Sequence, residues 1–327
     1  MSLKTLTQGA LMARFSPQDL ADHLKDGLLS FPATAFQDDL EVDEVAYVEH
    51  IEWQSSYPVA GLFAAGGTGE GFSLTVEENH RVTQLAVQAS SPEVPVLGSA
   101  TGSTKSAIAN AQGAEAAGAE GVLLLPPYLT ECDAEGLYNH AAAVCESTSL
   151  GVIVYNRANA IYSPEVIARL SERYPNFIGF KDGTGNIEHL AKITTLCGDR
   201  LFYLGGLPTA ETFALPLLQM GMSTYSSAMF NFIPDFALSF YADVRAQDSA
   251  AVKQKLSDFV LPYLDIRDRA QGYGVSIVKG GLKAVGRNAG GVRPPLRNLS
   301  EQDIADLSDL LATSGAGSYR LPVEVKA

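Results

Sequence analysis

The chain has 327 residues, of which 46% are hydrophobic and 18% are charged, a balance typical of a globular protein with a large core. Its net charge is −14, and no cluster of lysines and arginines is interleaved with aromatic residues, which argues against binding to nucleic acid or to membrane surfaces. No apolar run approaches the roughly 18 residues of a membrane span, and the N-terminus lacks the pattern of a secretory signal. We therefore expect a cytoplasmic protein.

Eight short apolar runs of strand type alternate with helical patterns along the chain. The runs begin near Leu29, Val59, Val94, Glu120, Gly151, Phe177, Leu201 and Met222, and the helical patterns between them include residues 76–89, 103–117, 134–145 and 164–174. Eight strands that alternate with helices predict a parallel sheet closed into a (β/α)8 TIM barrel over residues 26–250. A doubly wound open sheet is the alternative, because periodicity cannot show closure.

The rest of the chain is predicted to be helical or peripheral. A helix begins at Pro234, and further helical patterns follow at residues 251–271, 276–285 and 300–311. These predict an all-helical C-terminal extension over residues 251–327. Residues 1–25 are expected to form a peripheral N-terminal segment.

The cysteines and histidines do not indicate a metal site. Cys132, Cys145 and Cys197 are odd in number and lack close metal-ligand spacing, as is usual for reduced cysteines in a cytosolic chain. The five histidines form neither an HxH nor an HExxH pattern. We therefore expect no bound metal.

Lys181 ends the apolar run at residues 177–181, and a turn rich in glycine and threonine follows it. In a barrel this position lies at the carboxyl end of a strand, where active sites are built. Burial penalises the charged form of lysine, so a fold accepts this position more readily where it needs a nucleophilic amine for a carbonyl substrate. The alternative is a lysine that reaches water or pairs with Asp182. This segment alone does not decide between them.

Polar residues also follow other predicted strands. The glycine-rich loop at residues 66–71 could bind a carboxylate or phosphate through backbone N–H groups, although a plain tight turn is an equally good interpretation. Tyr155 could relay protons and Arg157 could bind a carboxylate, but a barrel-top aromatic residue and a surface arginine would give the same pattern. Ser226 and Ser227 end the eighth run, and their hydroxyls would point into the same cavity at the carboxyl end of the barrel.

Six motifs in order resemble the Schiff-base-forming class I aldolases and lyases of the dihydrodipicolinate synthase/N-acetylneuraminate lyase superfamily. They are FPATAF at 31–36, GTGE at 67–70, YN at 155–156, GFKD at 179–182, NFIP at 231–234 and GGVRPPL at 290–296. The resemblance implies that Lys181 forms the imine and that Tyr155 is the acid/base group beside it. It also implies that Gly67 and Thr68 bind the carboxylate next to the keto carbon, and that Ser226 and Ser227 line the pocket. No metal or organic cofactor is then required.

Departures from the family pattern narrow the expected reaction. Gly67 replaces the first threonine of the synthase loop, Leu129 replaces a second tyrosine, and Ala160 replaces an arginine. The segments GGTGE, PPYLT and YNRAN are instead similar to the 5-dehydro-4-deoxyglucarate dehydratase branch, whose members convert a six-carbon keto-diacid to 2,5-dioxopentanoate, water and carbon dioxide. We infer that Arg157 binds the distal carboxylate of such a small-molecule substrate.

Two alternatives to this dehydratase stay open. One is another class I enzyme of the superfamily, either dihydrodipicolinate synthase-like or an aldolase for 2-keto-3-deoxy sugar acids. The other is a catalytically silent relative that binds keto acids or serves as a regulator or scaffold, although the presence of both Lys181 and Tyr155 argues against it. Whichever of these functions holds, the helical extension and the family resemblance lead us to expect a homotetramer built from dimers.

Overall fold

A closed parallel barrel forms the centre of the molecule. The computed structural model describes residues 13–127 and 131–320. Within these residues, eight parallel strands form one sheet in chain order: β1 (Leu29–Ser30), β2 (Gly61–Phe63), β3 (Val96–Ala100), β4 (Gly121–Leu124), β5 (Gly151–Asn156), β6 (Phe177–Asp182), β7 (Phe202–Gly205) and β8 (Thr224–Tyr225). A parallel bridge between Leu29 and Ser226 joins the last strand to the first. The predicted barrel is therefore confirmed, and the open sheet is excluded.

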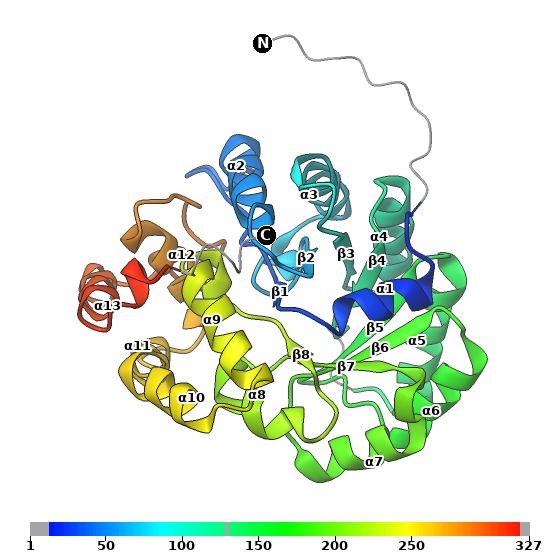
Figure 1. Ribbon diagram of the computed structural model, residues 1–327. Helices are drawn as coiled ribbons and strands as arrows, with labels where there is room; N and C mark the ends of the chain where they lie inside the picture. The colour runs from blue at the N-terminus through cyan, green and yellow to red at the C-terminus, as the bar shows by residue number, and fades with distance from the viewer. Residues whose placement is uncertain (1–12, 128–130, 321–327) are drawn as a thin grey trace.

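A helix follows each strand and covers the outside of the barrel (Figure 1). These helices are α2 (Glu44–Ser55), α3 (Val76–Ala89), α4 (Thr104–Ala116), α5 (Ala134–Ser147), α6 (Pro164–Arg173), α7 (Ile187–Cys197), α8 (Glu211–Leu218) and α9 (Pro234–Arg245). Polar side chains cap the first turn of several of these helices. Thr75 and Glu78 form a capping box at the start of α3, and the Ser163 side chain accepts a hydrogen bond from the Val166 amide at the start of α6.

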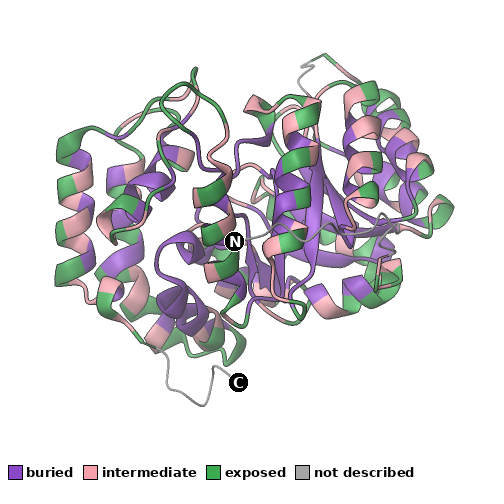
Figure 2. Cartoon of the chain, turned by 90° about the horizontal axis from the view of Figure 1, so that it is seen from above, coloured by how far each residue is buried: buried purple, intermediate pink, exposed green. Residues whose placement is uncertain are grey.

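The interior of the barrel is filled by side chains from the strands and is closed at its amino end by α1 (Pro17–Leu24). Leu20, Ala21 and Leu24 of this helix are buried in the same apolar cluster as Phe63 and Ile153. The strands are buried and lie within a ring of helices with exposed outer faces (Figure 2). The sequence predicts a peripheral segment at residues 1–25, but α1 within this segment contributes to the barrel core.

The C-terminal extension is helical, as predicted. Its helices are α10 (Ser249–Lys255), α11 (Leu261–Arg267), α12 (Tyr273–Ala284) and α13 (Glu301–Thr313). A π-helical turn at Leu256–Val260 joins α10 to α11 within the region expected to form one helix. Pro262 stands at the start of α11, where its missing N–H donor is tolerated because the ordinary helical hydrogen bonding is already interrupted.

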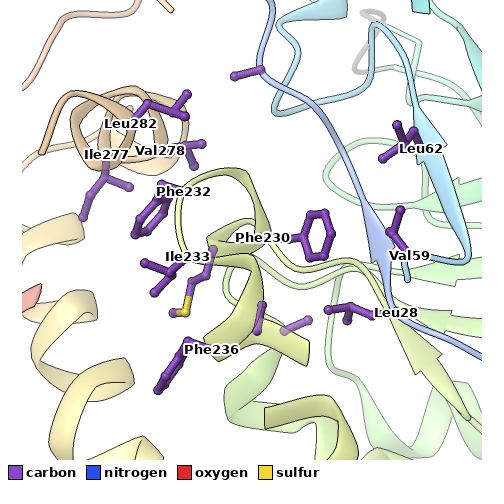
Figure 3. Close-up of a cluster of buried hydrophobic side chains, with 14 of the residues drawn as sticks. Leu28, Val59, Leu62, Phe230, Phe232, Ile233, Phe236, Ile277, Val278 and Leu282 are labelled. Carbon is purple, nitrogen blue, oxygen red and sulfur yellow. The ribbon is translucent and has the colours of Figure 1, made fainter. Parts of the chain in front are cut away.

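The extension is joined to the barrel by an apolar contact beside β8. Figure 3 shows Phe232 and Ile233 facing Ile277, Val278 and Leu282 of α12, and all five are buried. The buried Phe236 ring packs against Phe259 of the extension, with 5.1 Å between the ring centroids. Gly281 lets the Phe232 ring approach, because a Cβ there would lie 2.7 Å from the ring. This packing holds the extension next to the carboxyl end of the barrel.

Candidate active site

Lys181 lies near the carboxyl end of β6, directly across from Tyr155 of β5 in the parallel register. The side chain is only 4% exposed. Its Nζ lies 3.6 Å from the centroid of the Phe31 ring and 4.4 Å from the centroid of the Tyr155 ring. Strand pairing and two aromatic rings therefore determine where the amine lies.

The amine of Lys181 has no hydrogen-bond or ion-pair partner among the described residues. Burial lowers its pKa well below the usual value of 10.5, and the nearby charge of Arg157 lowers it further. Asp182 does not pair with it, because the Asp182 carboxylate accepts hydrogen bonds from Asn156, Thr184 and Gly185. The structure thus presents a buried amine whose surroundings favour the neutral, nucleophilic form over the charged one.

Tyr155 is buried beside Lys181 with its hydroxyl in a chain of hydrogen bonds. The hydroxyl donates to the carbonyl oxygen of Gly206 at 2.5 Å and accepts from Nη1 of Arg157 at 3.0 Å. Burial raises the pKa of Tyr155, while the charge of Arg157 and its hydrogen bond act in the opposite direction. A phenol held in this way can pass a proton to and from a group bound at Lys181.

Gly206 is a residue of this site that the sequence did not single out. It follows β7, and a Cβ at this position would lie 2.5 Å from Cε of Lys181 and 2.9 Å from a ring carbon of Tyr155. Only glycine leaves room for both side chains. Phe31 was likewise quoted only as part of a motif, although its ring is the nearest aromatic neighbour of the amine. The glycine pair at 205–206 after a strand was the available signal.

Gly67 and Thr68 lie in the loop after β2, and both are partly exposed. Nothing lies within 4 Å of a Cβ built on Gly67, so this residue faces open space. The loop is held from behind, where the hydroxyl of Thr34 donates to the carbonyl oxygen of Gly69 at 2.6 Å. Ala65 and Glu70 take left-handed backbone conformations at either end of the turn. The arrangement leaves room for a ligand in front of the loop.

A buried ion pair connects this loop to the C-terminal extension. Nζ of Lys279 lies 2.9 Å from a carboxylate oxygen of Glu70, and the other oxygen accepts the backbone N–H of Arg293 at 3.0 Å. The Lys279 amine also donates to the carbonyl oxygen of Gly291 at 2.6 Å. Burial lowers the pKa of Lys279, but these partners occupy its amine. Lys279 is therefore a structural lysine, unlike Lys181.

Ser226 and Ser227 follow β8 and differ in how their hydroxyls are used. Ser226 is partly exposed, whereas Ser227 is buried. The Ser227 hydroxyl donates to the buried carboxylate of Glu211 at 2.5 Å and accepts the backbone N–H of Phe230 at 3.3 Å. Burial raises the pKa of Glu211. Ser226 is thus the freer hydroxyl of the two.

One cavity of about 830 Å³ contains the residues that the sequence proposed for the site. Its lining includes Gly67, Thr68, Tyr155, Arg157, Lys181, Ser226 and Ser227. The extension adds residues to this lining that the sequence did not predict: Tyr263, Arg267, Asp268, residues 270–275 and Leu296. Leu129, one of the departures from the family pattern, lies outside the described residues. The structure therefore gathers side chains from all parts of the barrel at its carboxyl end.

The described residues contain neither a cluster of metal-binding side chains nor a helix suited to a membrane. No group of three or more His, Cys, Asp or Glu side chains within residues 13–127 and 131–320 could hold a metal ion. In the same part of the chain, no helix combines the length and apolar character that crossing a bilayer requires.

The chain is similar in sequence to the proteins of a known family. The model of the dihydrodipicolinate synthetase family matches residues 24–314. A protein of Arthrobacter sp. (strain FB24) named probable 5-dehydro-4-deoxyglucarate dehydratase is 68% identical over 302 residues, which is 92% of this chain and 99% of that protein. A protein of the same name from Saccharopolyspora erythraea is 55% identical over 305 residues, with 93% and 99% of the two chains covered.

Solved structures share the fold at lower identity. Dihydrodipicolinate synthase from Bacillus clausii superimposes with a TM-score of 0.82 at 25% identity, covering 90% of this chain and 98% of that one. YagE from Escherichia coli K12, a member of the dihydrodipicolinic acid synthase family solved in complex with pyruvate, gives a TM-score of 0.79 at 26% identity, covering 89% and 98% of the two chains. The chain belongs to the dihydrodipicolinate synthetase family.

Proposed function

We propose that the protein is a decarboxylating dehydratase that converts 5-dehydro-4-deoxy-D-glucarate to 2,5-dioxopentanoate, water and carbon dioxide through an imine on Lys181. The observation that carries this proposal is the buried amine of Lys181, which has no polar partner in the described chain and lies against the Tyr155 ring in the cavity. The choice of substrate is supported by relatives up to 68% identical that bear the name of this dehydratase.

The first stage of the proposed reaction forms the imine. The neutral amine of Lys181 attacks the C5 ketone, and a proton moves from nitrogen to the new carbinolamine oxygen. The Tyr155 hydroxyl assists this transfer, and the carbinolamine oxygen leaves as water. Arg157 and the Gly206 carbonyl hold the Tyr155 hydroxyl during these steps.

The second stage removes water and carbon dioxide. The protonated imine withdraws electrons, so a base can take a proton from C4, and the resulting enamine expels the C3 hydroxyl as water. The conjugated imine then accepts the electron pair of the C1–C2 bond as carbon dioxide leaves. Protonation and hydrolysis release 2,5-dioxopentanoate and the free amine of Lys181. The imine is the electron sink when the C4 proton is removed and when carbon dioxide leaves, whereas the enamine supplies the electron pair that expels the C3 hydroxyl.

The remaining residues are proposed to hold the two ends of the substrate. The loop at Gly67 and Thr68 would bind the C6 carboxylate next to the keto carbon, since it faces open space in the cavity. Arg157 would bind the C1 carboxylate, for which a planar guanidinium is well suited. Ser226 and Ser227 would line the pocket, with Ser226 the better placed to contact a substrate hydroxyl because the Ser227 hydroxyl is bound to Glu211.

Carbon dioxide release and covalent trapping test this proposal together. The wild-type protein should release carbon dioxide from 5-dehydro-4-deoxyglucarate and gain mass on Lys181 when borohydride is added with pyruvate. Lys181→Ala and Lys181→Arg should do neither, while far-UV circular dichroism shows an intact fold. Condensation of pyruvate with an aldehyde, without carbon dioxide release, would indicate an aldolase instead. A wild-type protein that gains no mass would be a silent keto-acid binder.

We also propose that the protein forms a homotetramer built from dimers. Exposed apolar side chains on the barrel, among them Ile161, Ile187 and Leu196, support contacts between subunits. Light scattering after size exclusion should give four times the chain mass of 34.7 kDa. A mass of one or two chains would contradict the proposal.

A further inference from the structure

A second arginine lines the cavity from the C-terminal extension. Arg267 ends α11, and its side chain is 17% exposed. Among the described residues that line the cavity, the basic ones are Arg157, Lys181 and Arg267, and the acidic one is Asp268. Burial favours the neutral form of Lys181. The two arginines are therefore the groups of this lining that are suited to bind an anion.

The position of Arg267 is set by the loop after β7. Its Nη1 donates to the hydroxyl of Thr209 at 2.8 Å and to the carbonyl oxygen of Pro208 at 3.2 Å. Thr209 is buried and has a φ of 57°. A β-branched residue in the left-handed region is a strained outlier, and such strain persists mainly where the surrounding structure serves a function. The loop therefore holds one edge of the guanidinium in a fixed place.

The other edge of the guanidinium is occupied by the neighbouring carboxylate. Nε of Arg267 donates to one oxygen of Asp268 at 2.7 Å, and Nη2 donates to the other at 3.0 Å. This two-point contact is the geometry in which arginine recognises carboxylates. Asp268 is 62% exposed, so water competes with its contact and the pair contributes little to stability.

We propose that Arg267 binds the C1 carboxylate of the keto-diacid together with Arg157, and that Asp268 occupies this site only until the substrate carboxylate displaces it. The proposal rests on the imine function proposed for Lys181. The exchange replaces one carboxylate with another, so the hydrogen bonds of the guanidinium are kept. Asp268 is released to water, where an exposed carboxylate is readily solvated. A protein of net charge −14 thereby keeps a positive site for a dianion.

Two keto acids of equal chain length test the role of Arg267. 2-Oxoadipate has a distal carboxylate, whereas 2-oxohexanoate has a methyl group in its place. The concentration that half-saturates borohydride trapping on Lys181 would be measured for each. Arg267→Gln should raise this concentration roughly 10- to 100-fold for 2-oxoadipate, the range for a lost charged hydrogen-bond pair, and leave 2-oxohexanoate within about twofold. An equal effect on both acids, or on neither, would overturn the proposal.

Arg269 provides the matched control in the same extension. Its guanidinium pairs with Asp303 and Asp306, and it does not belong to the cavity lining. Arg269→Gln should therefore leave trapping by both keto acids unchanged. If it changed the 2-oxoadipate value as much as Arg267→Gln, the effect would come from general charge and the proposal would fail.

Asp268 gives a test with the opposite sign. If it is a displaceable occupant, Asp268→Asn should lower the half-saturating concentration of 2-oxoadipate by up to about fivefold, the strength of an exposed pair. The same change in the Arg267→Gln background should have no effect, since the benefit depends on the guanidinium. A raised value in the single variant would make Asp268 a positioning residue. An equal gain in both backgrounds would indicate general electrostatics, and either result would refute the displacement.

These measurements are separate from the test of the dehydratase. Trapping of the two keto acids requires only the imine on Lys181, and 2-oxoadipate lacks the hydroxyl groups that the dehydration needs. Failure of carbon dioxide release from 5-dehydro-4-deoxyglucarate, with normal trapping, would reject the reaction and leave the assignment of Arg267 standing. Loss of the difference between the two acids, with normal carbon dioxide release, would reject Arg267 alone.

Discussion

Replacing Gly206 with alanine should misplace the amine of Lys181 with little loss of stability. The new Cβ would lie 2.5 Å from Cε and 2.6 Å from Cγ of Lys181, and 2.9 Å from a ring carbon of Tyr155. Carbon atoms in contact are normally about 3.5–4.0 Å apart, so the lysine must retreat by about 1 Å. A misplacement of that size costs on the order of 10²-fold in turnover. The flexible lysine absorbs most of the overlap, so the free energy of unfolding should fall by no more than about 1 kcal/mol, the low end for overpacking.

The assay would follow kcat for carbon dioxide release and the rate of borohydride trapping with pyruvate in Gly206→Ala. Both should fall together, because both depend on where the amine lies. Gly136→Ala is a suitable control, since it lies on the exposed face of α5 and its Cβ would meet only the side chains of Asp133 at 3.3 Å and Cys132 at 3.7 Å. A folded Gly206→Ala variant with kcat within about threefold of wild type would refute the idea that this close packing positions Lys181.

Three further predictions concern proton transfer, substrate binding and pH. Tyr155→Phe keeps the ring and loses the hydroxyl, so kcat should fall on the order of 10²–10⁴-fold while mass spectrometry still detects slow trapping; a near-normal kcat would make Tyr155 only a wall of the pocket. Arg157→Lys keeps the charge and loses the two-point geometry, and it also alters the contact to the Tyr155 hydroxyl. KM for the diacid should therefore rise by a larger factor than the half-saturating concentration for pyruvate trapping, and an equal rise in both would count against carboxylate binding by Arg157. Trapping of pyruvate should slow as pH falls through the lowered pKa of Lys181, because protonation removes the nucleophile. A trapping rate that kept rising up to the usual pKa of 10.5 would contradict the effect of burial.

The sequence predicted the fold well because its signals are local. Apolar runs separated by helical patterns identify each βα unit, and a helix such as α3 ends where the pattern at 76–89 ends. The strand ends were less accurate, since β2 and β8 are short and begin two residues after the predicted starts at Val59 and Met222. Apolar residues before a strand continue its pattern without joining the sheet. Closure could not be read from periodicity, because it depends on the pairing of Leu29 with Ser226 across nearly the whole barrel.

The candidate site was predictable where a residue stands at a strand end or in the loop just after it. Lys181 and Tyr155 were proposed from such positions, and the structure places them opposite each other on adjacent strands. Gly206 was missed because its importance lies in the absence of a side chain, which becomes visible only when Lys181 and Tyr155 approach it. Arg267 was missed because it lies in the extension, about 60 residues after the Thr209 hydroxyl that holds it. Contacts of this kind depend on the packing of the extension.

Two motifs that look unrelated in the sequence support the same lysine. The side chain of Asn231 accepts the backbone N–H of Ala33 at 2.9 Å and donates to the carbonyl oxygen of Phe31 at 3.1 Å. This fixes the segment after β1, and the ring of Phe31 in turn covers the amine of Lys181. Covering the amine lowers its pKa, and each unit of that shift opposes folding at neutral pH by about 1.4 kcal/mol. Asn231 therefore helps to keep the amine of Lys181 covered, which lowers stability but suits the proposed chemistry. Its buried carboxamide makes the two hydrogen bonds that hold the segment of Phe31, which explains why a polar side chain is buried at this position.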